Sequence, residues 1–267
     1  MIIIKTEKEI EIMRRGGRIL AEILKQVAIA AKPGATTGHL EKTACDLIKA
    51  AGGRPSFKGY KSMRDARAFP TALCVSINNE VVHAPALPPR KLNPGDIIGL
   101  DLGMEYPYGK NTRGYYTDMA VTAAIGKISK PAKKLINVTK KSLELAIKQV
   151  KPGNTLNDIG RAIRQYVEKQ GFSVVRELVG HGVGTAVHEE PQVPNYEISD
   201  GSERSGENII LKPGMTIAIE PMVNAGGWKI KTGKDGFTVL TADCALSAHF
   251  EHTVAVTEKG CEVLTYL

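Results

Sequence analysis

The sequence predicts an α/β (α+β) protein in which two related halves fold together into one domain, and three observations support this prediction. Segments with helical periodicity open each half, and apolar strand-like runs follow them. Two stretches of the first half recur in the second half at one shared offset. The chain of 267 residues is also long enough to bury a large core. We therefore expect a single domain, 1–267, built from halves of about 1–127 and 128–267.

Two helices are predicted at the start of the first half. Thr6 and Glu9 match a capping box, and apolar residues then recur at helical spacing, which predicts a helix over 7–31. The sequence Lys-Pro-Gly from Lys32 ends this helix. Thr37 can cap a second helix, which Gly52 and the glycine after it close.

Strand-like runs follow the second helix. They lie at 72–77, at 80–83 after an Asn-Asn turn, at 96–102 and at 118–125. The second half repeats this order, with helices predicted over about 131–150 and 156–169 before strands return.

The repeat relates acidic residues of the two halves. The segment KPGATTGHLEKTACDLIKAAG from Lys32 aligns without gaps on KPGNTLNDIGRAIRQYVEKQG from Lys151, and at the same offset GDIIGLD, ending at Asp101, falls on GMTIAIE, ending at Glu220. Farther along, the sequence around Asp118 resembles that around Glu251. In each half one carboxylate is predicted to end a strand and a second to begin the next, and pseudo-twofold symmetry would bring all four together.

Four converging carboxylates require positive charge. The strands that carry Asp101 and Glu220 are apolar enough to be buried on both faces, where an unpaired carboxylate is costly or stays protonated. Neither strand contains a basic residue, although a buried salt-bridge network is an alternative. With one histidine of the segment GHGVGTAVHEEP, which contains His181 and His188, the set would balance two divalent cations, as in two-metal hydrolytic centres. Oxygen donors predominate, so manganese, iron(II) and cobalt(II) suit this set as well as zinc.

Composition limits the other functional classes. No run of about 18 apolar residues is present, which predicts that no segment spans a membrane. The first residues lack the order of a signal peptide, and the four cysteines are widely spaced, so we expect a cytoplasmic protein with reduced thiols. The net charge is +8, with basic residues gathered at 14–18, 58–67 and 130–141. These clusters are compatible with a ribosomal or nucleic-acid surface, or simply with solvated helix faces.

The chain resembles the type I methionine aminopeptidases, which share the pita-bread fold with prolidases and creatinase. The matching segments cover nearly the whole chain: SINNEVVHAP, GDIIGLDLG, YTDMAVT, GHGVGTAVHEEPQVPNY, KPGMTIAIEPMVN, DGFTVLT and SAHFEHTVAVTEKGCEVLT. The resemblance implies a metallopeptidase domain with a central curved, mostly antiparallel sheet and helices on its outer face. It also implies a monomer that removes the initiator methionine from nascent proteins when the second residue is small.

The resemblance further implies two divalent metal ions and assigns their ligands. Asp118 and Glu251 would bridge the metals, His181 and Glu220 would complete one of them, and Asp101 would chelate the other. Glu220 would also transfer the proton of the attacking water.

Substrate contacts are implied by the same resemblance. His188 would donate a hydrogen bond to the developing oxyanion, and His83 would hold the leaving nitrogen. The residues expected around the methionine side chain are Tyr60, Phe69, Cys74 and Phe237, with Val187 close by. Phe237 and Val187 are departures, since relatives often have tryptophan or a bulkier group there.

Three inserted segments and two alternative functions remain open. The insertions lie near 61–68, 104–117 and 197–208, and their sequences do not distinguish a rim of the site from plain surface loop. An Xaa-Pro peptidase of the same fold is less favoured, because such relatives usually carry a large amino-terminal domain. A non-catalytic pita-bread protein that binds RNA or ribosomes would typically have lost metal ligands, and all five are present here.

Overall fold

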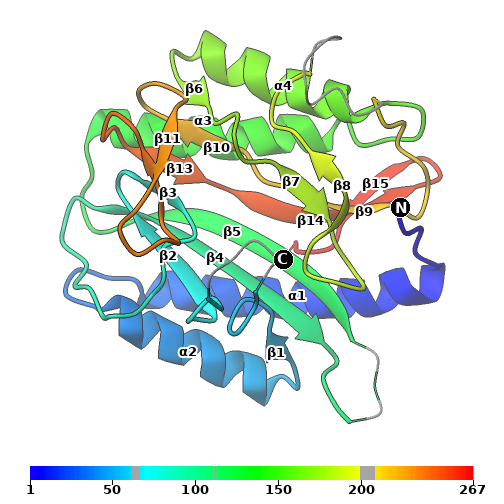
Figure 1. Cartoon of the computed structure of the whole chain (residues 1–267), viewed down its shortest axis with the longest axis horizontal. Helices are drawn as coiled ribbons and strands as arrows, with labels where there is room; N and C mark the ends of the chain where they lie inside the picture. Colours follow the sequence, from blue (N-terminus) through cyan, green and yellow to red (C-terminus); the bar gives the residue numbers. More distant parts are fainter. Residues whose placement is uncertain (62–66, 111, 113, 199–207, 267) are drawn as a thin grey trace.

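Four helices flank a curved antiparallel sheet in the computed structural model, which describes residues 1–61, 67–110, 112, 114–198 and 208–266. The helices of the described chain are α1 (Glu7–Ala30), α2 (Thr37–Ala50), α3 (Lys130–Ile147) and α4 (Leu156–Lys169). In Figure 1, α1 and α2 lie along one side of the molecule and α3 and α4 along the opposite side, with the strands between them. None of these helices is both long and apolar enough to cross a bilayer.

Equivalent positions of the repeat begin and end equivalent helices. The predicted capping box starts α1: Glu9 N–H donates to the Thr6 side chain, and the Glu9 carboxylate accepts from Thr6 N–H. The helices α2 and α4 each contain 14 residues and follow Thr36 and Thr155. The prediction that Thr37 caps α2 was therefore wrong by one residue, because the Thr37 hydroxyl is buried and donates to Ala86 O.

Nine strands form the main sheet, and every pair in it is antiparallel. Its order is β1-β4-β5-β14-β9-β7-β8, with β2 paired to β4 and β15 to β14. These strands are β1 (Arg54–Pro55), β2 (Leu73–Ile77), β4 (Ile97–Tyr106), β5 (Tyr115–Ala124), β7 (Gly180–Gly182), β8 (Glu189–Val193), β9 (Thr216–Ile219), β14 (Glu251–Thr257) and β15 (Gly260–Val263). Strands of both halves thus share one sheet, and the two halves meet where β5 pairs with β14.

Two three-stranded sheets complete the described strands. One has the order β13 (Ser247–His249), β10 (Met222–Asn224) and β6 (Ser173–Val174). The other has the order β11 (Ile230–Thr232), β12 (Val239–Thr241) and β3 (Glu80–Val82). The second of these joins the two halves, since β3 belongs to the first half and β11 and β12 to the second.

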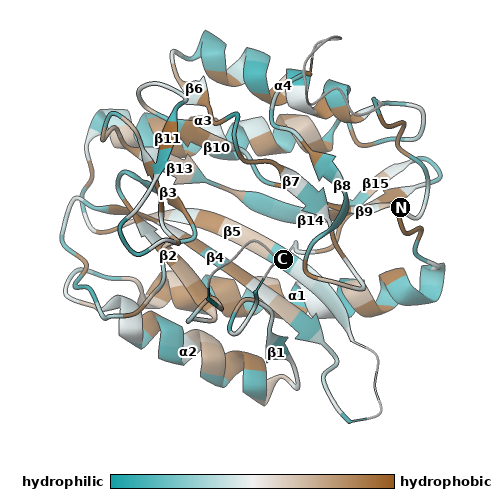
Figure 2. Ribbon diagram, viewed as in Figure 1, coloured by the Kyte–Doolittle hydropathy of each residue, from teal (hydrophilic) through white to brown (hydrophobic). Residues whose placement is uncertain are grey.

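Each half has its own hydrophobic core. In the first half, fully buried leucines of α1 and α2, such as Leu24 and Leu40, pack with Leu100 of β4. In the second half, Ile163 of α4 belongs to a cluster with Val254 of β14. Figure 2 shows that these helices carry hydrophobic and hydrophilic stripes, as expected for helices that bury one face.

The acids of the first half lie inside strands, which differs from the prediction. We expected a strand to end just after Asp101 and the next to begin at Asp118, but β4 continues to Tyr106 and β5 begins at Tyr115. The intervening residues include tyrosines and a threonine, which favour strands, and each extension gives the other a hydrogen-bonded partner. In the second half the prediction is confirmed, since Glu220 follows β9 directly and Glu251 begins β14.

The inserted segments are only partly described. Residues 62–66 of the first insertion and 199–207 of the third, for which a rim of the site and plain surface loop were both expected, lie outside the described residues. In the segment 104–117, residues 104–106 belong to the extended end of β4 and 115–117 to the extended beginning of β5, while 111 and 113 lie outside the described residues.

A buried carboxylate of α2 fixes the beginning of β2. Glu41 is 5% exposed and accepts hydrogen bonds of 2.9–3.0 Å from the N–H groups of Ala72 and Leu73. These two residues lead directly to Cys74, so this contact connects the helix layer to a strand that carries a predicted pocket residue.

We predict that Glu41→Gln lowers the free energy of unfolding by about 1–3 kcal/mol, because the amide group turns an acceptor into a donor opposite backbone N–H groups. Urea denaturation of both proteins measures the difference. The matched control is Glu22→Gln on α1, whose side chain is exposed and should change stability by less than about 0.5 kcal/mol. Equal effects of the two substitutions on stability would contradict the conclusion that Glu41 fixes the beginning of β2.

Candidate metal centre and cavity

The register of three neighbouring strands brings the acids of both halves onto one face. Asp101 of β4 pairs with Ala120 of β5, and Ala120 pairs on its other side with Glu251 of β14. Residues directly opposite each other in a sheet point to the same face, so the two acids flank Ala120. Asp118 precedes Ala120 by two residues and therefore points to that face as well.

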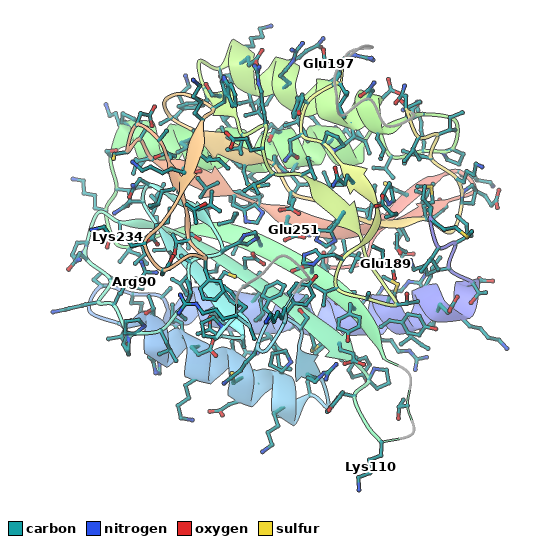
Figure 3. All side chains as sticks on the ribbon, in the orientation of Figure 1. Arg90, Lys110, Glu189, Glu197, Lys234 and Glu251 are labelled. Atoms are coloured by element: carbon teal, nitrogen blue, oxygen red, sulfur yellow. The ribbon has the colours of Figure 1, made fainter. Side chains whose placement is uncertain are left out.

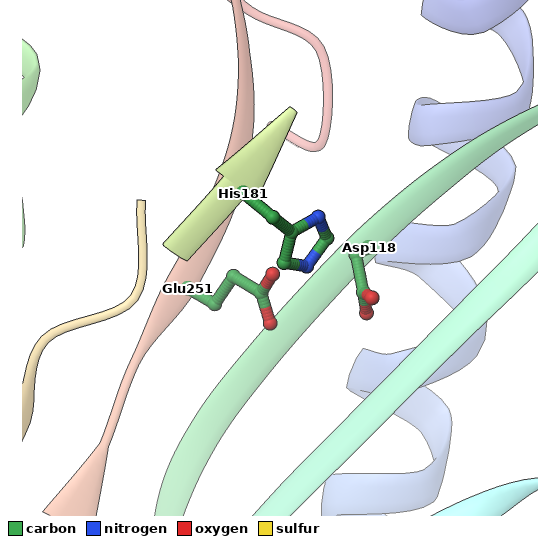
Figure 4. A group of neighbouring side chains, drawn as sticks. All are labelled: Asp118, His181 and Glu251. Atoms are coloured by element: carbon green, nitrogen blue, oxygen red, sulfur yellow. The ribbon is translucent and has the colours of Figure 1, made fainter. Parts of the chain in front are cut away.

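The second half adds two donors to the same face. His181 of β7 pairs with Ala218 of β9, and Glu220 follows Ala218 by two residues. Figure 4 shows the side chains of Asp118, His181 and Glu251 converging from three strands, and their ligand atoms lie within 4.8 Å of one another. The small side chains of Ala120 and Ala218 leave the space between the donors open.

One cavity contains every residue that the sequence and the resemblance singled out as a site residue. Its lining comprises Tyr60, Phe69, Cys74, His83, Asp101, Asp118, His181, His188, Glu220, Phe237 and Glu251, together with Phe57 and Gly236. The acids come from the main sheet, whereas the aromatic residues come from loops around it. The arrangement is therefore a polar floor with partly apolar walls.

Hydrogen bonds fix the orientation of His181. Its Nδ1 lies 2.8 Å from the backbone oxygen of Gly182, so Nδ1 carries the proton and donates it. Its Nε2 lies 3.7 Å from Glu220 Oε1 and keeps its lone pair for a cation. The pKa of His181 is lowered to about 4 by burial and by the neighbouring His188, which keeps this imidazole neutral.

Two threonines connect the acid-bearing strands where backbone pairing is irregular. The N–H of Asp118 donates to Thr253 Oγ1 at 2.9 Å, and the Thr253 hydroxyl donates to Asp118 O at 2.8 Å. Thr122 makes the same double contact with the backbone of His249. These contacts hold β5 against β13 and β14 and so fix the spacing between Asp118 and Glu251.

Burial and mutual repulsion strongly raise the pKa values of the four acids. Burial and then the neighbouring Glu220 raise the pKa of Asp118 to about 7, and burial raises the pKa of Glu220 to about 7 against the opposing effect of His181. Burial followed by the charges of the other acids raises the pKa values of Asp101 and Glu251 well above their ordinary range. The protein alone therefore does not stabilise four negative charges at this place.

The donor set fits divalent cations. Asp101 Oδ1 and Glu251 Oε1 are buried and have no hydrogen-bond partner among the described residues. No described lysine or arginine forms an ion pair with any of the four acids, which removes the salt-bridge network as an alternative in this part of the chain. Carboxylate oxygens with a single imidazole suit hard or borderline divalent metals.

Aromatic side chains form the walls beside the acids. Phe69 and Phe237 meet edge to face with ring centroids 5.4 Å apart, and Tyr60 OH lies 2.9 Å from His188 Nδ1. Burial and then Asp101 raise the pKa of the Cys74 thiol, which therefore stays protonated. Val187, which was expected close to these residues, is buried and is not among the described residues that line the cavity.

His249 is a neighbour of the site that the sequence analysis did not single out. It is 2% exposed, and its Nε2 lies 3.5 Å from Glu220 Oε2. Burial lowers its pKa to about 3, so it is neutral. Its position two residues before Glu251 was the available signal, although the two residues belong to different strands, β13 and β14.

Comparisons with known proteins give consistent results. A model of metallopeptidase family M24 matches residues 11–258. A methionine aminopeptidase of Clostridium acetobutylicum is 46% identical over 265 residues, which cover 99% of both chains. A crystal structure of methionine aminopeptidase from Thermotoga maritima superposes with a TM-score of 0.91 at 41% identity and covers both chains completely. A prolidase from Pyrococcus horikoshii shares the fold, with a TM-score of 0.74 at 21% identity over 99% of this chain and 63% of its own.

The raised pKa values predict how stability depends on pH. In chelator-treated protein, Asp118 and Glu220 hold protons up to about pH 7, whereas the unfolded chain releases them near 3.8 and 4.5. Their stabilising contribution is therefore lost as pH rises through 7. The lowered pKa values of His181 and His249 have the opposite effect on stability, but only below pH 6.5, the ordinary pKa of histidine. Above pH 6.5 we expect the free energy of unfolding, measured in urea, to fall with rising pH.

Saturating Mn²⁺ should reverse this dependence, because cations bind the deprotonated carboxylates and stabilise the folded state by mass action. The stabilisation by Mn²⁺ should therefore increase from pH 6.5 to about pH 8. Asp118→Asn, which removes one of the titrating groups, serves as the comparison and should weaken both trends. A chelator-treated protein that gained stability over this range would contradict the interpretation.

Proposed function

The chain belongs to metallopeptidase family M24, and from this premise we propose that it is a metal-dependent hydrolase that removes N-terminal methionine from peptides and nascent chains whose second residue is small. The observation that carries the proposal is the single cavity in which an acidic cluster with one imidazole adjoins aromatic rings and a thiol. A cation-binding floor can hold a free amino terminus and a scissile carbonyl, while the apolar wall can hold the methionine side chain.

Two divalent cations are the cofactors in this proposal, with cobalt, manganese, iron(II) and zinc as candidates. Asp118 and Glu251 would lie between the two cations, His181 and Glu220 would hold one, and Asp101 would hold the other. When bound, such cations polarise a carbonyl and make a water molecule acidic near neutral pH. The buried oxygens of Asp101 and Glu251 without hydrogen-bond partners support this assignment.

Glu220 is the general base and acid of the reaction. Its pKa of about 7 in the absence of cations indicates that its environment accepts both the protonated and the deprotonated form. It would take a proton from the attacking water and pass it to the leaving nitrogen. Asn195 supports this role, because its side-chain amide donates to Glu220 O at 3.0 Å and fixes the backbone at that position.

The two histidines of the cavity that are not metal ligands bind the reacting amide. Tyr60 OH lies 2.9 Å from His188 Nδ1, and in the tautomer whose Nδ1 accepts from this hydroxyl the proton of His188 resides on Nε2, which can donate to the developing oxyanion. His83 would hold the leaving nitrogen. It follows β3 with a left-handed φ of 59°, an uncommon conformation for a non-glycine residue that is frequent at functional sites.

The methionine side chain would occupy the space between Tyr60, Phe69, Cys74 and Phe237. A protonated thiol and ring edges are polarisable, and each sulfur–aromatic contact contributes about 0.3–1.5 kcal/mol. A substrate whose second residue is large would crowd the acidic floor, which explains the preference for small second residues.

The setting of the enzyme completes the proposal. We infer a cytoplasmic monomer whose single domain consists of the related halves 1–127 and 128–267. The equal lengths of α2 and α4 at matching positions of the repeat support this division. The basic clusters support association with the ribosome, where nascent chains emerge.

Peptide cleavage tests the proposed substrate class. Met-Gly and Met-Ala peptides should be cleaved with kcat/KM about 100-fold or more above that of Met-Lys peptides, because the larger second residue meets the floor of the site. Peptides with Xaa-Pro at the amino terminus, where Xaa is a residue other than methionine, should remain intact. The measurement is release of the first residue by the metal-loaded protein. A preference for Xaa-Pro would instead indicate the prolidase activity of the same fold.

Substitutions in the cavity test the mechanism. Glu220→Gln removes the proton carrier and should lower kcat by about 10³-fold or more, and His188→Ala should lower it by about 10²- to 10³-fold. Steady-state kinetics on a Met-Ala peptide gives both values, and urea denaturation checks that the variants fold. Full activity of a folded Glu220→Gln protein would rule out the proposed proton transfer.

A further inference from the structure

A buried ion pair between Lys5 and Glu189 lies beside the residues described so far. The Lys5 side chain is 1% exposed and that of Glu189 is 4% exposed. In every other ion pair of a lysine or arginine with an acid among the described residues, at least one side chain is more than a tenth exposed. Figure 3 labels Glu189 and Glu251, which begin two different strands, β8 and β14.

The carboxylate of Glu189 organises the loop that precedes it. Its Oε1 accepts from Thr185 N at 2.5 Å, from Thr185 Oγ1 at 2.6 Å and from Ala186 N at 3.0 Å, while its Oε2 accepts from Lys5 Nζ. Burial alone would raise the pKa of Glu189, but the hydrogen bonds from Lys5 and Thr185 lower it below its ordinary value. One ionised carboxylate thus satisfies four donors and closes the turn between β7 and β8.

Lys5 is itself fixed relative to the metal-binding strands. Its backbone N–H donates to Gly214 O at 2.8 Å in the turn before β9, and its ammonium also donates to Ile3 O at 3.2 Å. Gly184 makes room for it, because a Cβ there would lie 2.4 Å from Lys5 Cε. The position of the ammonium group is therefore fixed, and its ion pair with Glu189 holds the loop between β7 and β8 in place.

His188 ends the bend between β7 and β8 and is bonded directly to Glu189, the first residue of β8. Val187 and the Glu189 carboxylate are buried, whereas His188 is exposed and lines the cavity. The His188 ring lies 4.4 Å from the His181 ring, centroid to centroid. Anchoring Glu189 therefore fixes the backbone that carries the neighbouring imidazole of His188.

We propose that Lys5 and Glu189 are positioning residues that hold His188 in the orientation in which it donates to the reacting amide. The inference rests on the proposed aminopeptidase function. It extends that function by making the amino-terminal segment before α1 a part of the catalytic arrangement, although this segment does not line the cavity.

Glu189→Gln tests the proposal, because it keeps the shape of the side chain and places an amide where the ammonium needs a carboxylate. We expect kcat for a Met-Ala peptide to fall by about 10- to 100-fold, since small displacements of a catalytic group are costly, while KM changes less than about twofold. Metal content should be unchanged. The matched control is Glu190→Gln, the same change at the exposed neighbour, which should leave kcat unaltered.

A double substitution separates positioning from general weakening of the fold. In a His188→Ala background, Glu189→Gln should cause no further loss of kcat, because the residue through which it acts is absent. If the fall in kcat of the double variant were the product of the two single effects, the proposal would be overturned. Should Glu189→Gln fail to fold, Thr185→Val removes only the hydroxyl donor to Glu189 Oε1 and should lower kcat by about threefold, again only when His188 is present.

The outcomes distinguish this inference from the function on which it rests. A wild-type protein that does not release methionine would overturn both. A wild-type protein that does, and that loses turnover in His188→Ala but not in folded Glu189→Gln or Thr185→Val, would overturn the positioning of His188 alone.

Discussion

Mutual repulsion among buried carboxylates is the constraint on which the rest of the structure depends. Four acids share one face of a sheet, and their pKa values rise because burial disfavours the charged forms and no lysine or arginine of the described residues pairs with them. A fold can keep such a cluster only if its backbone is held independently. The two cores provide this, because the helices pack against the opposite face of the strands and leave the acidic face free.

Duplication offers a simple physical route to this arrangement. One half supplies Asp101 and Asp118 from a hairpin, and the other supplies Glu220 and Glu251 at the ends of adjacent strands. Because β5 and β14 pair directly, the acids of the two halves become neighbours through ordinary antiparallel register. β7 pairs with β9 as β2 pairs with β4, and Ser76 lies opposite Gly99 where His181 lies opposite Ala218. The repeat thus explains the four carboxylates, whereas the imidazole is present in the second half alone.

Different parts of this arrangement were predictable from sequence to different degrees. The helices and the acids followed from periodicity and from the repeat, and the cavity lining followed from the resemblance. The position of Asp101 and Asp118 within their strands did not follow, because strand ends depend on what the partner strand provides. His249 and Lys5 were also missed. A single histidine or lysine carries no periodic signal, and its importance arises from contacts between segments far apart in the chain.

The two kinds of site residue are held by two kinds of structure. The acids and His181 belong to paired strands or follow one directly, so their spacing is set by backbone hydrogen bonds that no single side chain controls. His83 and His188 lie outside strands, and the contacts of Tyr60 with His188 and of Lys5 with Glu189 are between side chains. Cation binding should therefore tolerate substitutions around the rim, whereas turnover should not. The residues that govern rate are then expected to extend farther from the cavity than those that govern cation affinity.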